Sequence, residues 1–292
     1  DRTDVDGKTI YGLRMWEQYE FEPRTDDVFQ EQLYAIKYER VELLPNGKTK
    51  TTRYYRAPNQ RDIENEEKVR EIVAKNLKSW QEQGLVPSME IEPGYNTDEP
   101  RRNRGWSYWH QLFNARQLFV NMLFSEYSRL AEKKVHIVAS ILGLNKCALF
   151  NSKLSMWVSS AGVEKPVWIF TNQALNPMFN YGSSALASLW NCWAYQINKY
   201  PLHSSSLVQL MDARDVRNKS ELWITDPPYA DAVNYHELSE VSISWDIIHL
   251  EKAFPAWYTD SKRILAVRGD EHFSQSMIEI YRNLTKHMPD DG

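Results

Sequence analysis

Residues 226–229 read Asp-Pro-Pro-Tyr and carry the groups best suited to chemistry in this 292-residue chain. They follow the apolar run 222–225, which is typical of a β-strand. Neither proline can donate to a β-ladder, and each restricts the residue before it, so the pattern predicts a stiff loop at the end of a strand. Such a loop presents a carboxylate, a carbonyl oxygen and an aromatic face. These groups can hold an exocyclic amine and stack on a planar base.

This motif and its continuation, residues 231–239, resemble the amino-methyltransferases that use S-adenosylmethionine to methylate adenine N6 or cytosine N4 in DNA. The resemblance implies that Asp226 and the Pro227 carbonyl accept hydrogen bonds from the target amine, while Tyr229 stacks on the flipped base. Pro228 completes the motif, and Asp in its first position favours adenine. Orientation and hydrogen bonding would supply most of the acceleration. The alternative interpretation is a loop that only ends a strand.

Two further segments are similar to a subgroup of large adenine-specific DNA methylases that carry a zinc ribbon, some of which sit beside anti-phage systems. Residues 104–118 contain Arg-Gly and then Leu-Phe-Asn-Ala-Arg-Gln-Leu, and residues 170–175 contain Asn-Gln-Ala-Leu. The matches cover about residues 104–292 in the subgroup's order. They imply an α/β fold with a partial Rossmann-like parallel sheet, DNA as the partner, and a role in restriction-modification or phage defence with partner proteins of that system.

The glycine pattern departs from the resembled family. Such enzymes hold the methionine end of S-adenosylmethionine with a Gly-rich loop, because the backbone must approach the ligand closely. The eleven glycines of this chain never form a Gly-x-Gly pair. In the subgroup, that loop and the zinc ribbon precede the Asp-Pro-Pro-Tyr segment. We therefore expect an internal fragment, incomplete at both ends and inactive on its own.

A remnant of the cofactor site is predicted at Asp212 and Ala213. Residues 207–213 resemble the family's strand that ends in Gly-Asp-Ala, whose Asp accepts from the adenine amine of the cofactor. Met211 replaces the glycine, so Asp212 is explained equally well as a solvated carboxylate at a strand end. Asp215 is a nearby substitute.

A basic and aromatic cluster and two residues behind the motif are candidate nucleic-acid contacts. The cluster consists of Arg101, Arg102, Arg104, Trp106, Tyr108 and Trp109. It suits phosphates and bases, but a solvated loop that leads into a helix with core aromatics explains it as well. Asn234 and Tyr235 could line the base pocket, although we favour Asn234 as the N-cap of the next helix.

Composition limits the class of protein. The net charge of −4 provides no global basic field, so contacts to nucleic acid must come from local patches. The two cysteines lack CxxC spacing, and the seven histidines lack metal-ligand spacing, so we expect buried thiols and no metal. No run of eighteen apolar residues or signal peptide is present, which predicts a cytoplasmic protein without membrane contact.

The hydrophobic pattern predicts two parts, an accessory region 1–103 and a partial catalytic domain 104–292. The first contains a β-hairpin in 31–57 with a Pro-Asn-Gly turn, a helix over 61–83, and a linker or exposed loop over 86–105. The second alternates helices and strands. Its helices are expected at 112–127, at 183–199, at 235–250 and at 271–288, and the first of them is expected to break near 133 and resume to 142. Its strands are expected at 206–210, 222–225 and 263–266.

The sequence thus favours a DNA adenine methyltransferase. Two alternatives stay open. One is an RNA or protein-glutamine amino-methyltransferase, because related motifs serve those reactions. The other is a non-catalytic nucleic-acid-binding module that keeps the fold without the cofactor loop.

Overall fold

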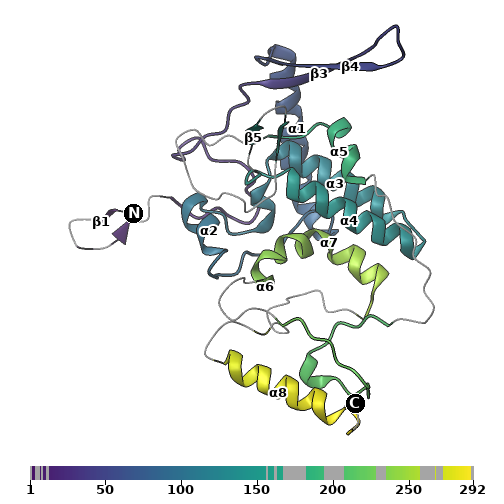
Figure 1. The fold of residues 1–292 in the computed structure, drawn as a ribbon. Helices are drawn as coiled ribbons and strands as arrows, with labels where there is room; N and C mark the ends of the chain where they lie inside the picture. The colour runs from purple at the N-terminus through teal and green to yellow at the C-terminus, as the bar shows by residue number, and fades with distance from the viewer. Residues whose placement is uncertain are drawn as a thin grey trace.

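The fold consists of a body of packed helices, a long β-hairpin on one side of it and a C-terminal helix on the other (Figure 1). In this computed structural model the described residues are 2–3, 7, 9–10, 13–155, 157–160, 163–166, 182–193, 207–227, 235–256, 267 and 272–290. Helices and strands are both present, so the fold is broadly α/β. The three described strand pairs are all antiparallel.

The elements of the first half are two strand pairs and three helical segments. In chain order they are β1 (Arg2–Thr3), β2 (Thr9–Ile10), β3 (Ile36–Leu43), β4 (Thr49–Arg56), α1 (Gln60–Glu82), α2 (Asp98–Arg104) and the 3-10 helix η1 (Trp109–Leu112).

The second half is mainly helical. Its elements are α3 (Ala115–Arg129), α4 (Lys134–Phe150), β5 (Trp157–Ser160), β6 (Val163–Pro166), α5 (Leu186–Trp193), the 3-10 helix η2 (Ala213–Asp215), α6 (Tyr235–Leu238), α7 (Glu240–Ala253) and α8 (Phe273–Lys286).

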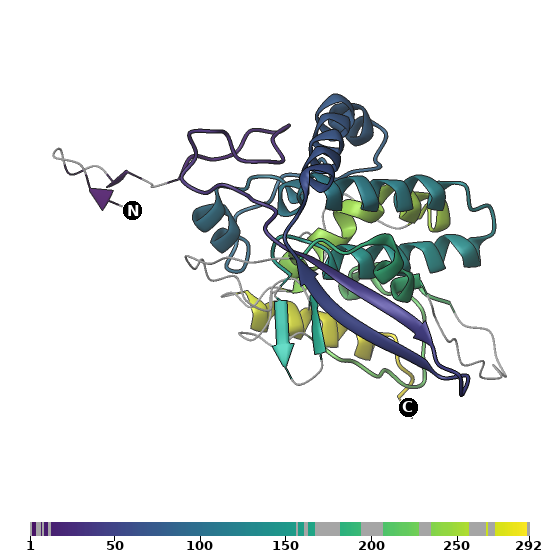
Figure 2. The same cartoon turned by 90° about the horizontal axis from the view of Figure 1, so that it is seen from above.

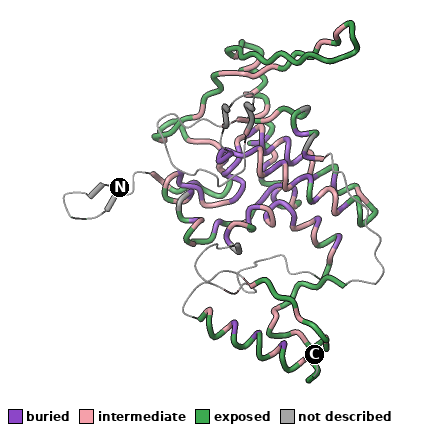
Figure 3. Tube along the Cα trace, in the orientation of Figure 1, coloured by how far each residue is buried: buried purple, intermediate pink, exposed green. Residues whose placement is uncertain are grey.

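The main hydrophobic core lies where α1, α3, α4 and α7 meet, and Figure 3 shows the buried positions gathered there. Leu77 of α1, Leu118 of α3, Leu144 of α4 and Trp245 of α7 are all at most 2% exposed. The Trp245 ring meets Phe113 edge to face, with ring centroids 5.2 Å apart. Because Trp16 and Phe21 belong to the same cluster, residues on both sides of position 103 share one core.

The elements that local sequence signals predict in the first half of the chain are present in the structure. The hairpin is confirmed as β3 and β4, with Gly47 in the left-handed region at φ 77°. The long helix is confirmed as α1, which begins at a capping box between Asn59 and Asp62. The expected break near residue 133 is also confirmed, because α4 begins at Lys134.

The later helices are confirmed in the residues that the structure describes. α6 and α7 cover the helix predicted over 235–250, and α8 covers the one predicted over 271–288. α5 occupies 186–193 of the range 183–199, and the rest of that range lies outside the described residues except for 183–185.

Two predicted strands are wrong. Residues 207–210 and 222–225 are irregular, and Leu207, Val208 and Ile224 are 75%, 74% and 89% exposed. A strand needs a neighbour to take its backbone hydrogen bonds, and no described segment supplies one to either run. Consequently no parallel sheet is found in the part of the chain that the structure describes. The third expected strand, 263–266, lies outside that part.

The predicted exposed loop at 86–105 is also wrong, because much of it is packed into the body. Val86 and Ile91 are at most 1% exposed, and residues 98–104 form α2. The backbone N–H groups of Ile91 and Trp109 donate to the carbonyls of Ser107 and Met89 at 2.7 and 3.1 Å. Prolines and charges suggested a linker, but the apolar residues between them reach the core.

Candidate functional site

The Asp-Pro-Pro-Tyr motif begins at the end of an extended segment that lies on α8. Asp226 is exposed and Pro227 is half-buried, so this carboxylate is open to solvent. Pro228 and Tyr229 lie outside the described residues. The structure therefore places the carboxylate in an accessible position and leaves the stacking role of Tyr229 as a prediction.

The chain before the motif is held on α8 by a small apolar cluster and several hydrogen bonds. Trp223 packs in the cluster built on Met277, Ile280 and Leu284. The side-chain amide of Asn283 donates to the carbonyls of Ala213 and Val216, both at 3.0 Å, and Ser220 N–H donates to the His287 carbonyl at 3.0 Å. Figure 1 shows this unit below the helical body. It fixes the direction from which the chain enters the motif.

The chain after the motif is anchored to the helical body by Glu237 of α6. This side chain is 4% exposed, and its two oxygens accept the backbone N–H groups of Tyr95 and Asn96 at 3.1 and 2.7 Å. A Cβ at Gly94 would meet a Glu237 carboxylate oxygen, so a larger residue there would push this side chain out of its present position. Sequence reasoning missed this contact, and the glycine after Pro93 was the one available signal. The motif thus joins two separately anchored parts.

Asp212 is engaged within its own loop. It is the N-cap of η2 and accepts from the Arg214 backbone N–H at 2.9 Å. The Arg214 guanidinium donates to both carboxylate oxygens at 2.6–3.1 Å, and this pairing lowers the pKa of Asp212. The neighbouring Ala213 carbonyl accepts from Asn283. Asp215 lies 3.6 Å from Arg217 in an exposed ion pair.

This geometry does not fit a site for S-adenosylmethionine. Asp212 would have to release Arg214 before it could accept from an adenine amine, and the strand expected to carry it is irregular. Without a Gly-x-Gly pair in the sequence, the described residues also provide no close backbone approach for the methionine end.

The three arginines before η1 have different surroundings. Arg101 donates to the Ile91 carbonyl, and Arg104 is 8% exposed with its guanidinium 5.9 Å from the Trp106 ring centroid. Arg102 is exposed. Trp106 is 4% exposed and belongs to the main core. Trp106 and Trp109 thus belong to the main core, Tyr108 is half-buried, and Arg102 is the exposed one of the three arginines.

The two candidates behind the motif are only partly described. Asn234 lies outside the described residues, so its role as an N-cap or a base contact stays a prediction. α6 begins at Tyr235, as expected for the start of that helix.

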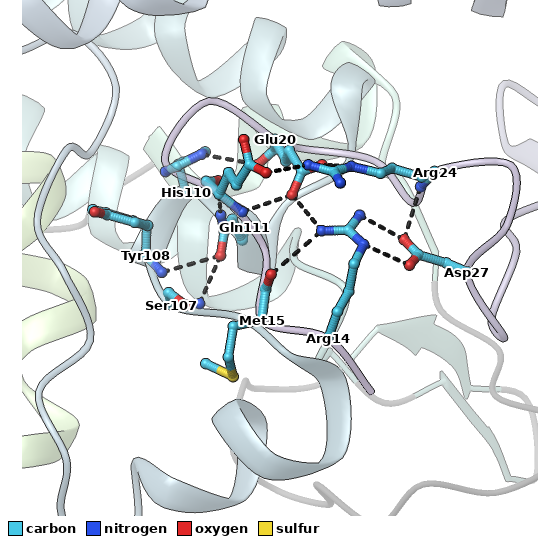
Figure 4. A network of polar contacts seen from close by, with 10 residues as sticks. Arg14, Met15, Glu20, Arg24, Asp27, Ser107, Tyr108, His110 and Gln111 are labelled. Carbon is cyan, nitrogen blue, oxygen red and sulfur yellow. Dashed lines mark hydrogen bonds and ion pairs between the residues drawn. The ribbon is translucent and has the colours of Figure 1, made fainter. Parts of the chain in front are cut away.

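His110 has a structural environment. It is fully buried, and its Nδ1 accepts from Gln81 at 3.2 Å. Its Nε2 donates to the Glu20 carbonyl at 3.1 Å (Figure 4). Burial lowers the pKa of His110 to about 3, so the ring is neutral near pH 7. The ring holds the N-terminal segment on η1 and is shielded from solvent.

Arginine and carboxylate groups reinforce that segment. Arg14 donates to both oxygens of Asp27 at 2.7 Å and to Glu20 at 2.6 Å, and Arg24 also pairs with Glu20 (Figure 4). These pairs are internal to the segment, so we assign them to folding.

A serine and a histidine meet between α3 and α7. Ser125 Oγ and His249 Nε2 lie 3.0 Å apart, and both side chains are at most 1% exposed. Burial lowers the pKa of His249 to about 4. Asp246 lies three residues earlier in α7, and burial raises its pKa to about 8. The three groups are of the types found in hydrolases, but no substrate can reach them in this arrangement. Their role is structural.

An apolar pocket lies between α3, α4 and α5. Its volume is about 500 Å³, and Phe124, Tyr127, Trp190 and Trp193 line it. No carboxylate that could hold an amine is among the described residues that line it. The pocket is separate in sequence from the Asp-Pro-Pro-Tyr segment.

The remaining observations concern thiols, metals and membranes. Cys147 and Cys192 are free and buried, as predicted, and the hydrogen bond between them together with burial raises the pKa of Cys147. Among the described residues no group of three His, Cys, Asp or Glu side chains could hold a metal ion. No helix in that part of the chain is long and apolar enough to span a membrane.

Comparison of the chain with models of known families, with curated proteins and with solved structures gave no significant match.

Proposed function

We propose that this chain carries the base-holding loop of a DNA amino-methyltransferase that acts on adenine N6. The observation that carries the proposal is the Asp-Pro-Pro-Tyr motif, whose Asp226 is solvent-exposed between two anchored parts of the molecule. Asp226 and the Pro227 carbonyl would accept from the target amine, and Tyr229 would stack on a base flipped from the duplex. The anchors at Trp223 and Glu237 would limit the positions that the loop can take.

The cofactor of the proposed reaction is S-adenosylmethionine, which supplies the methyl group. Asp212 is held by Arg214, and the sequence lacks a Gly-x-Gly pair. We therefore propose that the 292-residue chain by itself binds this cofactor weakly and needs a further structure that provides the Rossmann-like site.

A second candidate is a non-catalytic nucleic-acid-binding module. The observation in its favour is the same engagement of Asp212, together with the irregular backbone of residues 207–210 and 222–225. On this alternative, Asp226 has no chemical role and the chain contributes binding alone.

The test is Asp226→Ala in cells that carry the gene in its natural context. We expect N6-methyladenine to be lost from the methylated sites of their DNA, as measured by mass spectrometry and sequencing. Glu221→Ala is the matched control, because it removes an exposed carboxylate from the same segment. If the unaltered cells contain N6-methyladenine and both variants retain it, the proposed role of Asp226 is contradicted. Absence of gene-dependent methylation in the unaltered cells would favour the binding module.

A further inference from the structure

The β3–β4 hairpin extends from the helical body with little of its own surface covered. Every residue of β4 is exposed, and none of the buried core clusters takes a member from either strand (Figure 3). Eight cross-strand pairs from Ile36–Arg56 to Leu43–Thr49 form its ladder, and Figure 2 shows it as a two-stranded ribbon beside the helices. An isolated hairpin is marginally stable in water. Such a ribbon is well placed to contact a partner.

The strand register places basic and aromatic side chains on one face. Tyr38 and Tyr54 are cross-strand partners with stacked rings 5.5 Å apart, and the Arg56 guanidinium lies 5.4 Å from the Tyr38 ring centroid. Because side chains alternate between faces, Arg40 and Lys50 continue the same face toward the turn. We name this the tyrosine face and define it by these five residues.

The other face of the ribbon makes a cation–π contact with β5. Lys37 Nζ lies 5.4 Å from the ring centroid of Trp157 at the start of β5. On the same face Arg53 pairs with Glu39 at 2.7 Å. The tyrosine face is therefore directed away from the Lys37–Trp157 contact.

Charge separates the hairpin from the rest of the molecule. Residues 36–56 contain six basic and two acidic side chains, a net charge of +4, in a chain whose total is −4. Glu42 also lies on the tyrosine face, opposite Lys50 and 3.0 Å from Arg40, but an exposed ion pair of this kind is worth little. A basic ribbon on an otherwise acidic molecule attracts a polyanion and orients its approach.

We propose that the tyrosine face of the β3–β4 hairpin binds duplex DNA in the major groove. That groove is about 12 Å wide and admits a two-stranded β-ribbon, and a strand of eight residues is roughly 26 Å long. Arg40, Lys50 and Arg56 contact phosphates or base edges, and the two tyrosines support them. A-form RNA has a deep, narrow major groove that excludes such a ribbon, which favours DNA over duplex RNA. This binding is distinct from methyl transfer and needs no cofactor.

The test is the affinity of the full 292-residue chain for a ~20-base-pair DNA duplex, measured by fluorescence anisotropy between about 50 and 200 mM salt. We expect the triple variant Arg40→Gln, Lys50→Gln, Arg56→Gln to bind at least about tenfold more weakly. The slope of log affinity against log salt should flatten by about 0.9 for each phosphate contact that is lost. Arg53 is left unchanged because it lies on the opposite face of the hairpin.

The matched control removes three exposed charges from helices, with Lys68→Gln, Lys75→Gln and Arg282→Gln, and should bind within about twofold of the unaltered chain. Circular dichroism should show the same helix content in all three proteins, since the hairpin lies outside the core. Equal affinities for the two triple variants, no duplex binding by the unaltered chain, or tighter binding to an RNA duplex or an acidic protein would each overturn the proposal. Asp226→Ala should retain DNA binding, because Asp226 does not belong to the tyrosine face. DNA binding by the hairpin and methylation at Asp226 are therefore tested independently.

Discussion

The helical body and the unit around α8 are built on very different amounts of buried surface. In the body, four helices converge, and Trp109, Phe113 and Trp245 are fully buried. In the α8 unit, Met277, Ile280 and Leu284 form one stripe along the helix and remain 7–9% exposed. The short 3-10 helix η2 and irregular chain cover that stripe, where a long helix or a strand would bury more of it. Local stability follows burial, so the segment that carries the motif belongs to the less stable region.

The comparison shows how this chain divides its tasks. The body holds deeply buried polar groups and aromatic residues in fixed positions, whereas the α8 unit presents an exposed carboxylate on a lightly anchored segment. The following predictions test that contrast, and they begin with the largest expected effect.

Trp245→Ala is expected to destabilise the body by about 3–5 kcal/mol, because it removes a large buried ring and leaves a cavity beside Phe113. The free energy of unfolding in urea measures the effect. Trp190→Ala is the control, since this ring is 71% exposed and its loss should cost no more than about 0.5 kcal/mol. Similar losses in the two variants would show that α7 does not organise the core.

The buried histidines of the body are expected to make its stability fall in acid. Burial lowers the pKa of His110 to about 3 and that of His249 to about 4, whereas both titrate near pH 6.5 in the unfolded chain. At pH values between these folded and unfolded pKa values, the unfolded chain binds more protons than the folded one. Stability is therefore lost as pH falls through this window, by at most about 1.4 kcal/mol per pH unit for each histidine. His249→Gln should flatten the acid limb of a plot of unfolding free energy against pH. An unchanged limb would contradict the buried neutral state.

Asp246 acts in the opposite direction. Burial raises its pKa to about 8, so between about pH 4 and 8 the folded chain keeps a proton that the unfolded chain releases. Its contribution to stability is present below the unfolded pKa and is lost as pH rises toward 8. Asp246→Asn keeps the shape and removes this titration, so the variant should be more stable than the unaltered chain at pH 8. If both proteins show the same alkaline limb, Asp246 is ionised in the folded state.

Asn283→Ala is expected to loosen the α8 unit without affecting the body. The variant loses hydrogen bonds to the Ala213 and Val216 carbonyls, an effect of about 1–2 kcal/mol on that unit. Hydrogen exchange should become faster in residues 212–223, while the amides of α3 and α4 stay protected. Gln275→Ala on the exposed side of α8 should leave exchange unchanged. Faster exchange throughout the body would show that the two regions unfold together.

Ile224→Ser has the smallest expected effect, below about 0.5 kcal/mol, because this side chain is 89% exposed. A loss of more than about 2 kcal/mol in urea unfolding would instead indicate a buried strand, as the sequence pattern predicts. This variant is therefore the sharpest comparison between the sequence prediction and the structure.

Much of the fold could be predicted from local patterns. The turn at Pro45-Asn46-Gly47 and the alternation on both sides of it specify the hairpin, and a capping box and apolar spacing specify α1. These elements form their own hydrogen bonds, so they need little information from the rest of the chain. The run 222–225 has an equally clear strand pattern, but a strand forms only where another one accepts its hydrogen bonds.

The candidate site was less predictable than the helices. The residue types at 226–229 identify the motif, yet its anchors are contacts between residues far apart in the sequence. Glu237 meets the backbone of residues 95 and 96 across more than 140 positions. The surroundings of two other candidates likewise depend on their neighbours. Asp212 is paired with Arg214, and Arg104 is buried against the Trp106 ring.

The sequence by itself determined the helices, the hairpin, the buried thiols and the chemical hypothesis of a base-holding loop, because each rests on residues close together in the chain. The tertiary structure decided which charged groups remain available. Burial removed Arg104 from solvent and lowered the pKa of His110, so that this ring is neutral. Asp226 and most of the tyrosine face stayed exposed, and the motif is connected to two different parts of the molecule. These outcomes depend on burial and on contacts between residues far apart in the sequence, and neither can be predicted from the pattern of neighbouring residues.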